Sequence, residues 1–182
     1  PTVCMRRGFF GACPQRPGPG RGWFLASQVH KRLDNAVPFI RYVWGMEVRI
    51  ESLLSGAKKA EGTVVVIDVY RAFTTTAVAL SRGAEKLLLT ADVNEAFLLR
   101  RQNLGDCCIG EVGGVKPTGF DFGNSPYEIS HAQFHGQVPI LSTRAGTVGV
   151  DAARKADRIY GASLATAKAT AAVLLAARPA LV

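Results

Sequence analysis

The stretch "VVVIDVYRAFTTT", Val64 to Thr76, joins an apolar run to an acid, an arginine and three consecutive threonines. A short uninterrupted apolar run is typical of a strand that is covered on both faces. Residues 74–83 follow with apolar side chains at helical spacing and a closing glycine, which predicts a helix. The stretch therefore predicts a strand, a turn that carries Asp68 and Arg71, and a helix that opens on threonines.

The same unit recurs along the chain. Strands are predicted at residues 46–50, 63–68, 86–91, 106–111, 138–143 and 158–162, and helices at 74–83, 92–102, 146–156 and 163–177. Asp92, with Glu95 three residues later, has the spacing of a capping box at a helix start. Alternation with short connections predicts an α/β domain, with a mostly parallel sheet and helices on both faces. Pro179 ends the last helix and "ALV" resembles a new strand, so we expect the sheet to be incomplete at the C-terminus.

Residues 1–45 differ in character from the rest of the chain. They hold seven basic residues and one acid, a net charge of +6, whereas residues 46–182 hold 15 basic and 13 acidic residues. The Pro/Gly/Arg-rich run at 13–22 is unsuited to helix or strand. We expect 1–45 to be an irregular basic leader outside the fold and 46–182 to be a truncated α/β domain. The alternative is a basic arm that binds an acidic partner.

The charge and apolar patterns also exclude several classes of protein. The net charge of +8 belongs mostly to the leader, so it does not predict a nucleic-acid-binding domain. No apolar run reaches 18 residues and no secretion signal opens the chain, which predicts a cytoplasmic protein without a membrane span. Cys107 and Cys108 belong to no CxxC pair and are predicted to be buried thiols. His131 and His135 are predicted to be surface residues.

Polar residues follow the carboxyl ends of three predicted strands, where open parallel sheets bind ligands. These residues are Asp68, Arg71, Thr74, Thr75 and Thr76 at the end of strand 63–68, Glu111, Lys116, Asp121, Asn124 and Ser125 at the end of strand 106–111, and Ser142, Thr143, Arg144 and Thr147 at the end of strand 138–143. Threonines at a helix start, preceded by Arg71, predict a cradle for a phosphate or sulfonate. The alternative is that a threonine only caps the helix.

Three of these residues are carboxylates. Asp68, Glu111 and Asp121 are predicted to bind one Mg²⁺, since magnesium prefers one or two carboxylates with water and substrate oxygens. The alternative is that each pairs with a neighbouring Arg or Lys. "STRAGT", residues 142–147, is predicted to form a second anion cradle. "GFDFGNSP", residues 119–126, is predicted to be a ligand-binding loop that leads into a helix, or else a merely structural turn.

Four motifs together resemble the 2-phosphosulfolactate phosphatase family over residues 47–177. They are "VVVIDVYRAFTT", "RGAEKL", "IGEVGGVKPTGFDFGNSPYE" and "LSTRAGT". The matching positions are Asp68, Arg71, Thr74, Thr75, Glu111, Gly113, Gly114, Asp121, Gly123, Asn124, Ser125, Thr143, Gly146 and Thr147. The resemblance implies a magnesium-dependent acid phosphatase linked to coenzyme M biosynthesis. Phe73 stands where many members have a small hydroxyl residue, and family members continue with another strand and a Gly-rich acidic segment.

The residues and the resemblance together predict hydrolysis of a phosphate monoester, either 2-phosphosulfolactate or a related phosphorylated 2-hydroxy acid. Asp68, Glu111 and Asp121 are predicted to hold Mg²⁺, while Arg71, Thr74 and Thr75 hold the phosphate. Arg144 or Lys116 would bind the second anionic end, and either water or Asp68 itself would attack phosphorus. Asn124, Ser125, Thr143 and Thr147 complete the predicted binding set. The alternatives are a non-catalytic module for anionic metabolites, an inactive fragment, or nucleic-acid binding through the leader. A homodimer is also left open.

Overall fold

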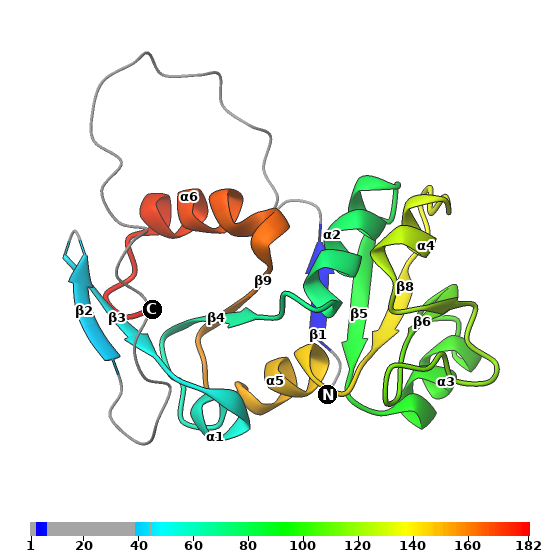
Figure 1. Ribbon diagram of the computed structural model, residues 1–182, viewed down its shortest axis with the longest axis horizontal. Helices are drawn as coiled ribbons and strands as arrows, with labels where there is room; N and C mark the ends of the chain where they lie inside the picture. The colour runs from blue at the N-terminus through cyan, green and yellow to red at the C-terminus, as the bar shows by residue number, and fades with distance from the viewer. Residues whose placement is uncertain (1–2, 7–38, 44) are drawn as a thin grey trace, which may run out of the picture.

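The computed structural model describes residues 3–6, 39–43 and 45–182 (Figure 1). The strands are β1 (Val3–Arg6), β2 (Phe39–Val43), β3 (Met46–Ile50), β4 (Thr63–Ile67), β5 (Lys86–Thr90), β6 (Cys107–Gly110), β7 (Phe122–Gly123), β8 (Pro139–Ser142) and β9 (Arg158–Ala162). The helices are α1 (Leu53–Ala57), α2 (Ala72–Ser81), α3 (Val93–Arg101), α4 (Pro126–Ser130), α5 (Gly146–Ala152), the 3₁₀ turn η2 (Leu164–Thr166) and α6 (Ala167–Ala177). The alternation confirms the α/β class.

The largest sheet has the strand order β1-β5-β8-β6-β7. Strands β5, β8, β6 and β7 are parallel, and β1 joins the edge in antiparallel pairing. Every residue of β6 and β8 is buried. Side chains alternate across this sheet. Leu89, Ile109 and Leu141 pack on the face that α2, α4 and α5 cover, whereas Cys108 and Ile140 pack under α3.

Strands β4 and β9 form a separate parallel pair, with Val64 opposite Ile159 and Val66 opposite Gly161. Helix α5 packs on one face of the pair, where a methyl group of Val66 lies close to Gly149. No residue of β4 is fully buried, and Ile67 at its end is 69% exposed. The predicted strand is therefore confirmed, but the heavy burial expected from its apolar run is not found.

Strands β2 and β3 form an antiparallel hairpin. The last residues of the chain lie beside it: Leu181 pairs in parallel with Glu47, and Thr63 donates to the Leu181 carbonyl at 3.3 Å. The strand expected at "ALV" therefore begins as predicted, between β3 and β4. The predicted sheet is divided into one five-stranded and two two-stranded parts among the described residues, because β4 and β9 do not hydrogen-bond to β5.

Two stretches of residues 1–45 correct the expectation of irregular structure. Val3–Arg6 pairs with β5, and Phe39–Val43 pairs with β3. Alternating apolar side chains were too few in these short stretches to indicate strands. Residues 7–38, which include the Pro/Gly/Arg-rich run, lie outside the described residues, and the boundary between leader and domain stays a prediction.

Several local predictions can be checked directly. Asp92 caps α3, since its carboxylate accepts from Asn94 N at 2.6 Å and from Glu95 N at 3.3 Å. Glu95 does not complete the capping box in the expected way, because its carboxylate accepts from the Thr90 hydroxyl. The helices begin and end within a few residues of the expected positions.

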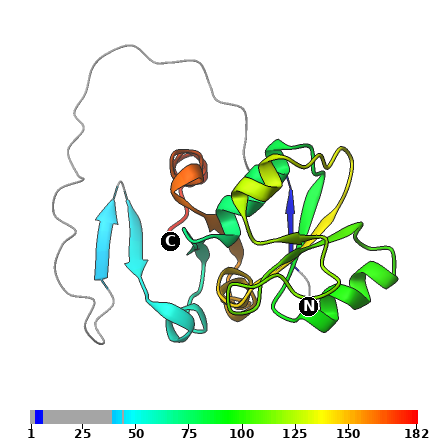
Figure 2. The same ribbon diagram turned by 45° about the vertical axis from the view of Figure 1, so that its right-hand side comes forward.

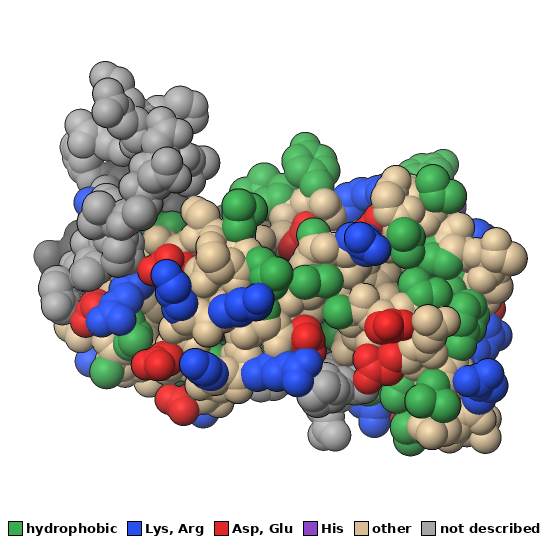
Figure 3. Space-filling view, turned by 90° about the horizontal axis from the view of Figure 1, so that it is seen from below, with side chains coloured by type: hydrophobic (Ala, Val, Ile, Leu, Met, Phe, Trp, Pro, Cys, Tyr) green, Lys and Arg blue, Asp and Glu red, His purple; other side chains and the backbone are tan. Residues whose placement is uncertain are grey.

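The cysteines follow the sequence prediction. Cys107 and Cys108 are buried free thiols, and burial raises the pKa of Cys107 to about 12. Figure 3 shows Lys and Arg side chains interspersed with Asp and Glu on the face seen from below. Among the described helices, none is long and apolar enough to cross a membrane.

Candidate functional site

Asp68 lies where two helices begin. It follows β4, and its amide extends the pairing with β9 by donating to the Ala162 carbonyl at 2.9 Å. Its carboxylate accepts backbone N–H groups from Ala72, the first residue of α2, and from Gly146, the first residue of α5. A Cβ atom on Gly146 would lie 2.7 Å from Asp68 Oδ2, so only glycine permits this approach. Asp68 thus occupies the positive ends of both helices.

The surroundings of Asp68 raise its pKa above the ordinary value of 3.8. Burial is the largest cause, because a carboxylate loses hydration when it is enclosed. The hydrogen bonds from Ala72 and Gly146 lower the pKa, the negative charge of Glu111 raises it, and the positive charge of Arg71 lowers it. Asp68 is therefore a half-buried carboxylate that holds a proton more readily than an exposed one.

Glu111 joins two loops beside Asp68. Its Oε2 accepts from Gly114 N at 2.7 Å, and its Oε1 accepts from Arg144 N at 3.0 Å. Its own amide donates to the Ser142 carbonyl at 3.1 Å. The loop after β6 and the turn after β8 are therefore held together by one carboxylate, and that carboxylate lies close enough to act on the charge of Asp68.

Two arginines flank these carboxylates. Arg71 is the residue before α2, after a cis peptide bond with Tyr70, and Arg144 is exposed in the turn before α5. Neither guanidinium makes a hydrogen bond or an ion pair with another residue in the described part of the chain. Anion binding by Arg71 and Arg144 stays a prediction.

The threonine hydroxyls of the first predicted cradle do not all point to solvent, and two of them donate to backbone carbonyls. The Thr74 hydroxyl donates to the Val69 carbonyl at 3.2 Å, and the Thr76 hydroxyl donates to the Ala72 carbonyl at 2.9 Å. Thr75 is fully buried, and its hydroxyl has no hydrogen-bond partner among the described residues. No threonine side chain caps α2 among the described residues, so the capping alternative is not found, and substrate binding by Thr74 and Thr75 stays a prediction.

The threonines of "STRAGT" bind each other. Thr147 Oγ1 donates to the Thr143 carbonyl at 2.6 Å, and Thr143 N donates to Thr147 Oγ1 at 3.1 Å. Thr147 N donates in turn to Thr143 Oγ1 at 3.3 Å, and both residues are buried. This closed set orders the turn that places Gly146 against Asp68. Direct contact between these hydroxyls and a substrate stays a prediction.

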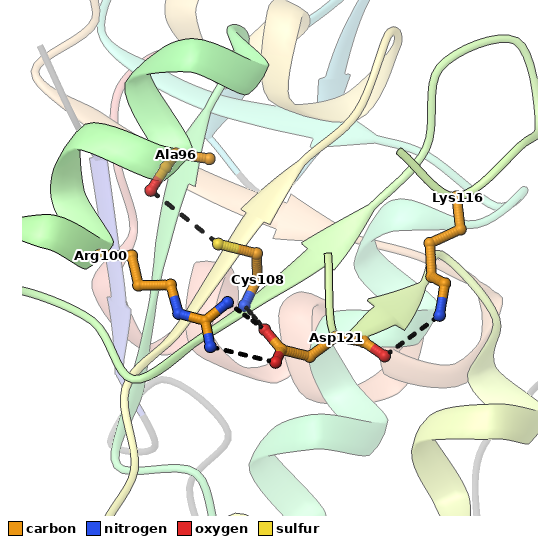
Figure 4. A network of polar contacts seen from close by, with 5 residues as sticks. All are labelled: Ala96, Arg100, Cys108, Lys116 and Asp121. Carbon is orange, nitrogen blue, oxygen red and sulfur yellow. Dashed lines mark hydrogen bonds and ion pairs between the residues drawn. The ribbon is translucent and has the colours of Figure 1, made fainter. Parts of the chain in front are cut away.

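Asp121 lies elsewhere, in the network drawn in Figure 4. Its carboxylate accepts from the Arg100 guanidinium at 2.9 and 3.2 Å and from Cys108 N at 2.8 Å. Lys116 Nζ donates to the Asp121 carbonyl at 3.4 Å. Glu111, the residue that follows β6, is three residues beyond Cys108, roughly 10 Å along an extended chain. Asp121 therefore pairs with an arginine, the alternative that the sequence left open.

The three predicted metal ligands thus do not meet. Asp68 and Glu111 come together, whereas Asp121 points to α3 near the opposite end of β6. Within residues 3–6, 39–43 and 45–182, no group of three acidic, His or Cys side chains has a metal-binding arrangement. Any magnesium site would consist of two carboxylates completed by water and substrate oxygens, which is a donor set that Mg²⁺ accepts.

The "GNSP" turn contains a further residue that the sequence reasoning missed. Ser125 caps α4 by accepting from Glu128 N at 3.3 Å, and Glu128 Oε2 accepts from Gly123 N at 3.0 Å. The S-x-x-E spacing of Ser125 and Glu128 was the signal that could have revealed this clamp. Asn124, between Gly123 and Ser125 in the sequence, is 6% exposed, and its Oδ1 has no hydrogen-bond partner in the described residues. An unpaired buried acceptor is unusual and suits a ligand donor.

Residues 49–182 match the sequence profile of a family described as 2-phosphosulpholactate phosphatase. A "Probable 2-phosphosulfolactate phosphatase" of Carboxydothermus hydrogenoformans is 43% identical over 125 residues, which cover 69% of this chain and 50% of the relative. Proteins with the same description from Thermus thermophilus and Thermoplasma acidophilum are 39% and 36% identical, and the match covers 69% and 65% of this chain and 53% of each relative. The chain spans about half the length of the curated relatives it matches. Since the profile match covers most of its residues, the chain belongs to the 2-phosphosulfolactate phosphatase family.

Proposed function

We propose that this protein acts in the magnesium-dependent hydrolysis of the phosphate monoester of 2-phosphosulfolactate or of a related phosphorylated 2-hydroxy acid. One observation carries the proposal: the Asp68 carboxylate lies where α2 and α5 begin, and each helix start is preceded by an arginine, Arg71 or Arg144, whose guanidinium makes no hydrogen bond or ion pair with the described residues. The relatives' descriptions name the same reaction. The place in coenzyme M biosynthesis, the cytoplasmic location and a homodimer stay predictions of the sequence.

The two arginines suit a substrate with two anionic ends. A guanidinium binds phosphate or sulfonate through two parallel N–H groups. Arg71 is adjacent to Asp68 and would hold the phosphoryl group, where negative charge spreads in the transition state. Arg144 would hold the sulfonate or carboxylate. Asn124 is a candidate for the polar middle of the substrate, because its buried Oδ1 has no hydrogen-bond partner among the described residues.

Asp68 and Glu111 are the residues that would hold Mg²⁺. Glu111 keeps lone pairs free beyond the two that accept Gly114 N and Arg144 N, since a carboxylate has about four acceptor positions. When bound, magnesium polarises the phosphoryl oxygens and neutralises the charge that develops on them. Asp121 is not included among these ligands, because its carboxylate already accepts hydrogen bonds from Arg100 and from Cys108 N.

Asp68 has two chemical routes. In the first, it takes a proton from a water molecule whose oxygen bonds to phosphorus, while the ester P–O bond breaks and the leaving alkoxide takes a proton from solvent water. In the second, Asp68 Oδ itself bonds to phosphorus as the ester bond breaks, and water later hydrolyses the aspartyl-phosphate. Rapid-quench capture of a phosphoenzyme that is absent from Asp68→Ala decides for the second route.

The proposal is tested by phosphate release from 2-phosphosulfolactate, with and without Mg²⁺. The assay uses residues 1–182 and a version extended to the family's full length. We expect Asp68→Asn to lower kcat at least ~100-fold, the usual scale for a positioned acid or base. Glu61→Gln, at the opposite end of β4, is the matched control and should leave the rate unchanged. Absence of release from both lengths would contradict the proposal, whereas release from the extended version alone identifies residues 1–182 as an inactive fragment.

A non-catalytic module for anionic metabolites is the second candidate. It is favoured by one observation: both oxygens of Glu111 already accept backbone amides, so Glu111 serves the structure of the loops. This candidate predicts that 2-phosphosulfolactate binds equally well after Mg²⁺ is removed and that no phosphate is released. Calorimetric titration in the presence and absence of a chelator separates the two.

A further inference from the structure

The carboxyl end of β9 brings one further polar residue to the candidate site. Strands β4 and β9 are parallel, and their register places Ile67 opposite Ala162. Asp68 N continues this pairing by donating to the Ala162 carbonyl at 2.9 Å. Ser163, whose backbone is extended, is therefore the residue opposite Asp68. Since neighbouring strands lie about 4.8 Å apart, Ser163 is a close neighbour of the candidate carboxylate.

The side chains of Asp68 and Ser163 lie on the same face of the β4–β9 pair. Side chains alternate between the two faces along a strand, so Asp68 shares a face with Val66. A methyl group of Val66 lies close to Gly149 of α5, so α5 covers this face. Asp68 accordingly accepts the amide of Gly146, the first residue of α5. Because residues paired in register point to the same face, the Ser163 side chain is directed to the side where α5 begins.

The hydroxyl of Ser163 has a proton to donate and no acceptor. Ser163 is 3% exposed, and its Oγ has no hydrogen-bond partner among the described residues. Its backbone is satisfied, since Ser163 N donates to Thr166 Oγ1 at 2.9 Å and the Ser163 carbonyl accepts from Thr166 N at 3.1 Å. The two residues have the arrangement of a capping box, in which the serine oxygen only accepts. The Ser163 O–H group therefore remains without an acceptor, which is unusual for a buried donor.

A second hydroxyl of the same kind lies on α2. Thr75 is fully buried, and its Oγ1 has no hydrogen-bond partner among the described residues. It is three residues beyond Ala72, so the two residues share one side of the helix, and helical side chains tilt toward the N-terminus. Ala72 donates its amide to Asp68, and α2 packs against both β9 and η2. Two buried hydroxyl groups from different elements therefore lie near Asp68 with protons to donate.

We propose that Ser163 is a ligand-binding residue of the candidate site, and that its hydroxyl, together with that of Thr75, donates to an oxygen of the phosphoryl group. The inference rests on the proposed function, because it names the group of the substrate that lies beside Asp68. A phosphoryl oxygen carries negative charge, and hydrogen bonds to charged acceptors are the stronger ones. A lysine or arginine in this position would pair with Asp68, whereas a neutral hydroxyl donates to the phosphoryl oxygen without forming an ion pair. Donors that a strand and a helix hold in place before the substrate binds need no rearrangement during the reaction.

The test measures the binding of inorganic phosphate at equilibrium, so it does not require turnover. Calorimetric titration in the presence of Mg²⁺ uses residues 1–182 and the version extended to the family's full length. Ser163→Ala should weaken phosphate binding at least ~10-fold, the loss expected when a hydrogen bond to a charged acceptor is removed. Ser163→Thr keeps the hydroxyl and should restore most of the affinity. Ser81→Ala is the matched control and should bind phosphate as the parent does, because the Ser81 hydroxyl donates to the Val78 carbonyl in the last turn of α2.

Urea unfolding of the same variants separates ligand binding from a structural role. Thr75→Val replaces the hydroxyl by a methyl group of similar size, and it should weaken phosphate binding without lowering the unfolding free energy, because no protein hydrogen bond is lost. A Ser163 hydroxyl that only caps η2, or that only binds a buried water molecule, predicts a less stable Ser163→Ala variant with unchanged phosphate affinity. That result overturns the proposal.

The remaining outcomes distinguish this inference from the proposed reaction. Phosphate binding that depends on Ser163, without phosphate release from 2-phosphosulfolactate, would support the inference and contradict the reaction. Phosphate release by the parent, with unchanged phosphate affinity and unchanged kcat in Ser163→Ala, would contradict the inference alone. Absence of phosphate binding by both lengths of the parent would also overturn it.

Discussion

The β5–β8–β6–β7 sheet and the β4–β9 pair are built from similar sequences and end in different environments. Figure 2 shows helices above and below the first, whereas β4 and β9 form a separate sheet. Every residue of β8, "PILS", is buried, while the equally apolar β4, "TVVVI", has no buried residue. An apolar sequence therefore shows only that a strand is suited to burial. Whether the strand is buried depends on the helices and strands that pack against it.

The candidate site lies on the boundary between these two regions. We call the buried β5–β8–β6–β7 sheet the closed region and the less buried β4–β9 pair the open region. Asp68 follows β4 in the open region, and Glu111 follows β6 in the closed region. Gly146 begins α5, which contacts both β4 and β5. Glu111 is thus attached to a fully buried strand, whereas Asp68 is attached to a strand without buried residues. The following changes test how far the two regions differ.

The largest expected effect is on the closed sheet. Leu141→Ala removes a side chain with no exposed surface and should cost about 2–5 kcal/mol of unfolding free energy, from lost burial and a residual cavity. Leu174→Ala on α6 removes a half-buried side chain and should cost less than about 1 kcal/mol. Urea unfolding of both variants measures the contrast. Equal losses would show that the open region is packed as tightly in solution as the closed one.

A smaller effect is expected at the junction of the helices. Gly146→Ala brings a methyl group within 2.7 Å of Asp68 Oδ2 and of the Ala72 side chain, so it should cost about 1–3 kcal/mol through overpacking. Gly149→Ala is the matched control on the same helix. Its methyl meets only Val66, at 3.1 Å, and a glycine inside a helix gains from replacement by alanine. Thermal unfolding should place the Gly149 variant at or above the parent, and a neutral Gly146 variant would disprove the close junction.

The smallest effect is a pH dependence at Asp68. Because its folded pKa lies above the ordinary 3.8, the stability it contributes is fully present below that pH and is lost as the pH rises through the folded pKa. The unfolding free energy of the parent minus that of Asp68→Asn should therefore fall as the pH rises from about 3 to about 7. Denaturant titrations across this range measure the difference. A rise would mean that the hydrogen bonds from Ala72 and Gly146 outweigh burial.

Much of the site could be predicted because local rules apply where a strand meets a helix. The positions of Asp68 and Arg71 followed from an apolar run and a helix start, and the cap at Asp92 followed from residue type alone. Asp121 was predicted to lie with them because it comes after the same strand as Glu111, and the carboxyl ends of parallel strands meet at one edge of a sheet. It instead pairs with Arg100 on α3, a residue 21 positions away, and no local pattern carries that information.

The strands near the N-terminus were missed for a similar reason. Val3–Arg6 and Phe39–Val43 have little periodicity of their own and become strands by pairing with β5 and β3. The hydroxyls of Thr143 and Thr147 were correctly located around the start of α5, but their mutual hydrogen bonds depend on a turn geometry that residue type does not specify.

The amino-acid sequence by itself determined the α/β class, the order of most strands and helices, and the carboxylate that ends β4. These follow from apolar periodicity, capping residues and glycine, which act over a few neighbouring residues. Only the tertiary structure decided that Asp68 receives the amides of both α2 and α5, that Asp121 is held away from it, and that β4 has no buried residue. These depend on which distant segments pack together, since a side chain's partner is set by the fold and not by its neighbours in sequence.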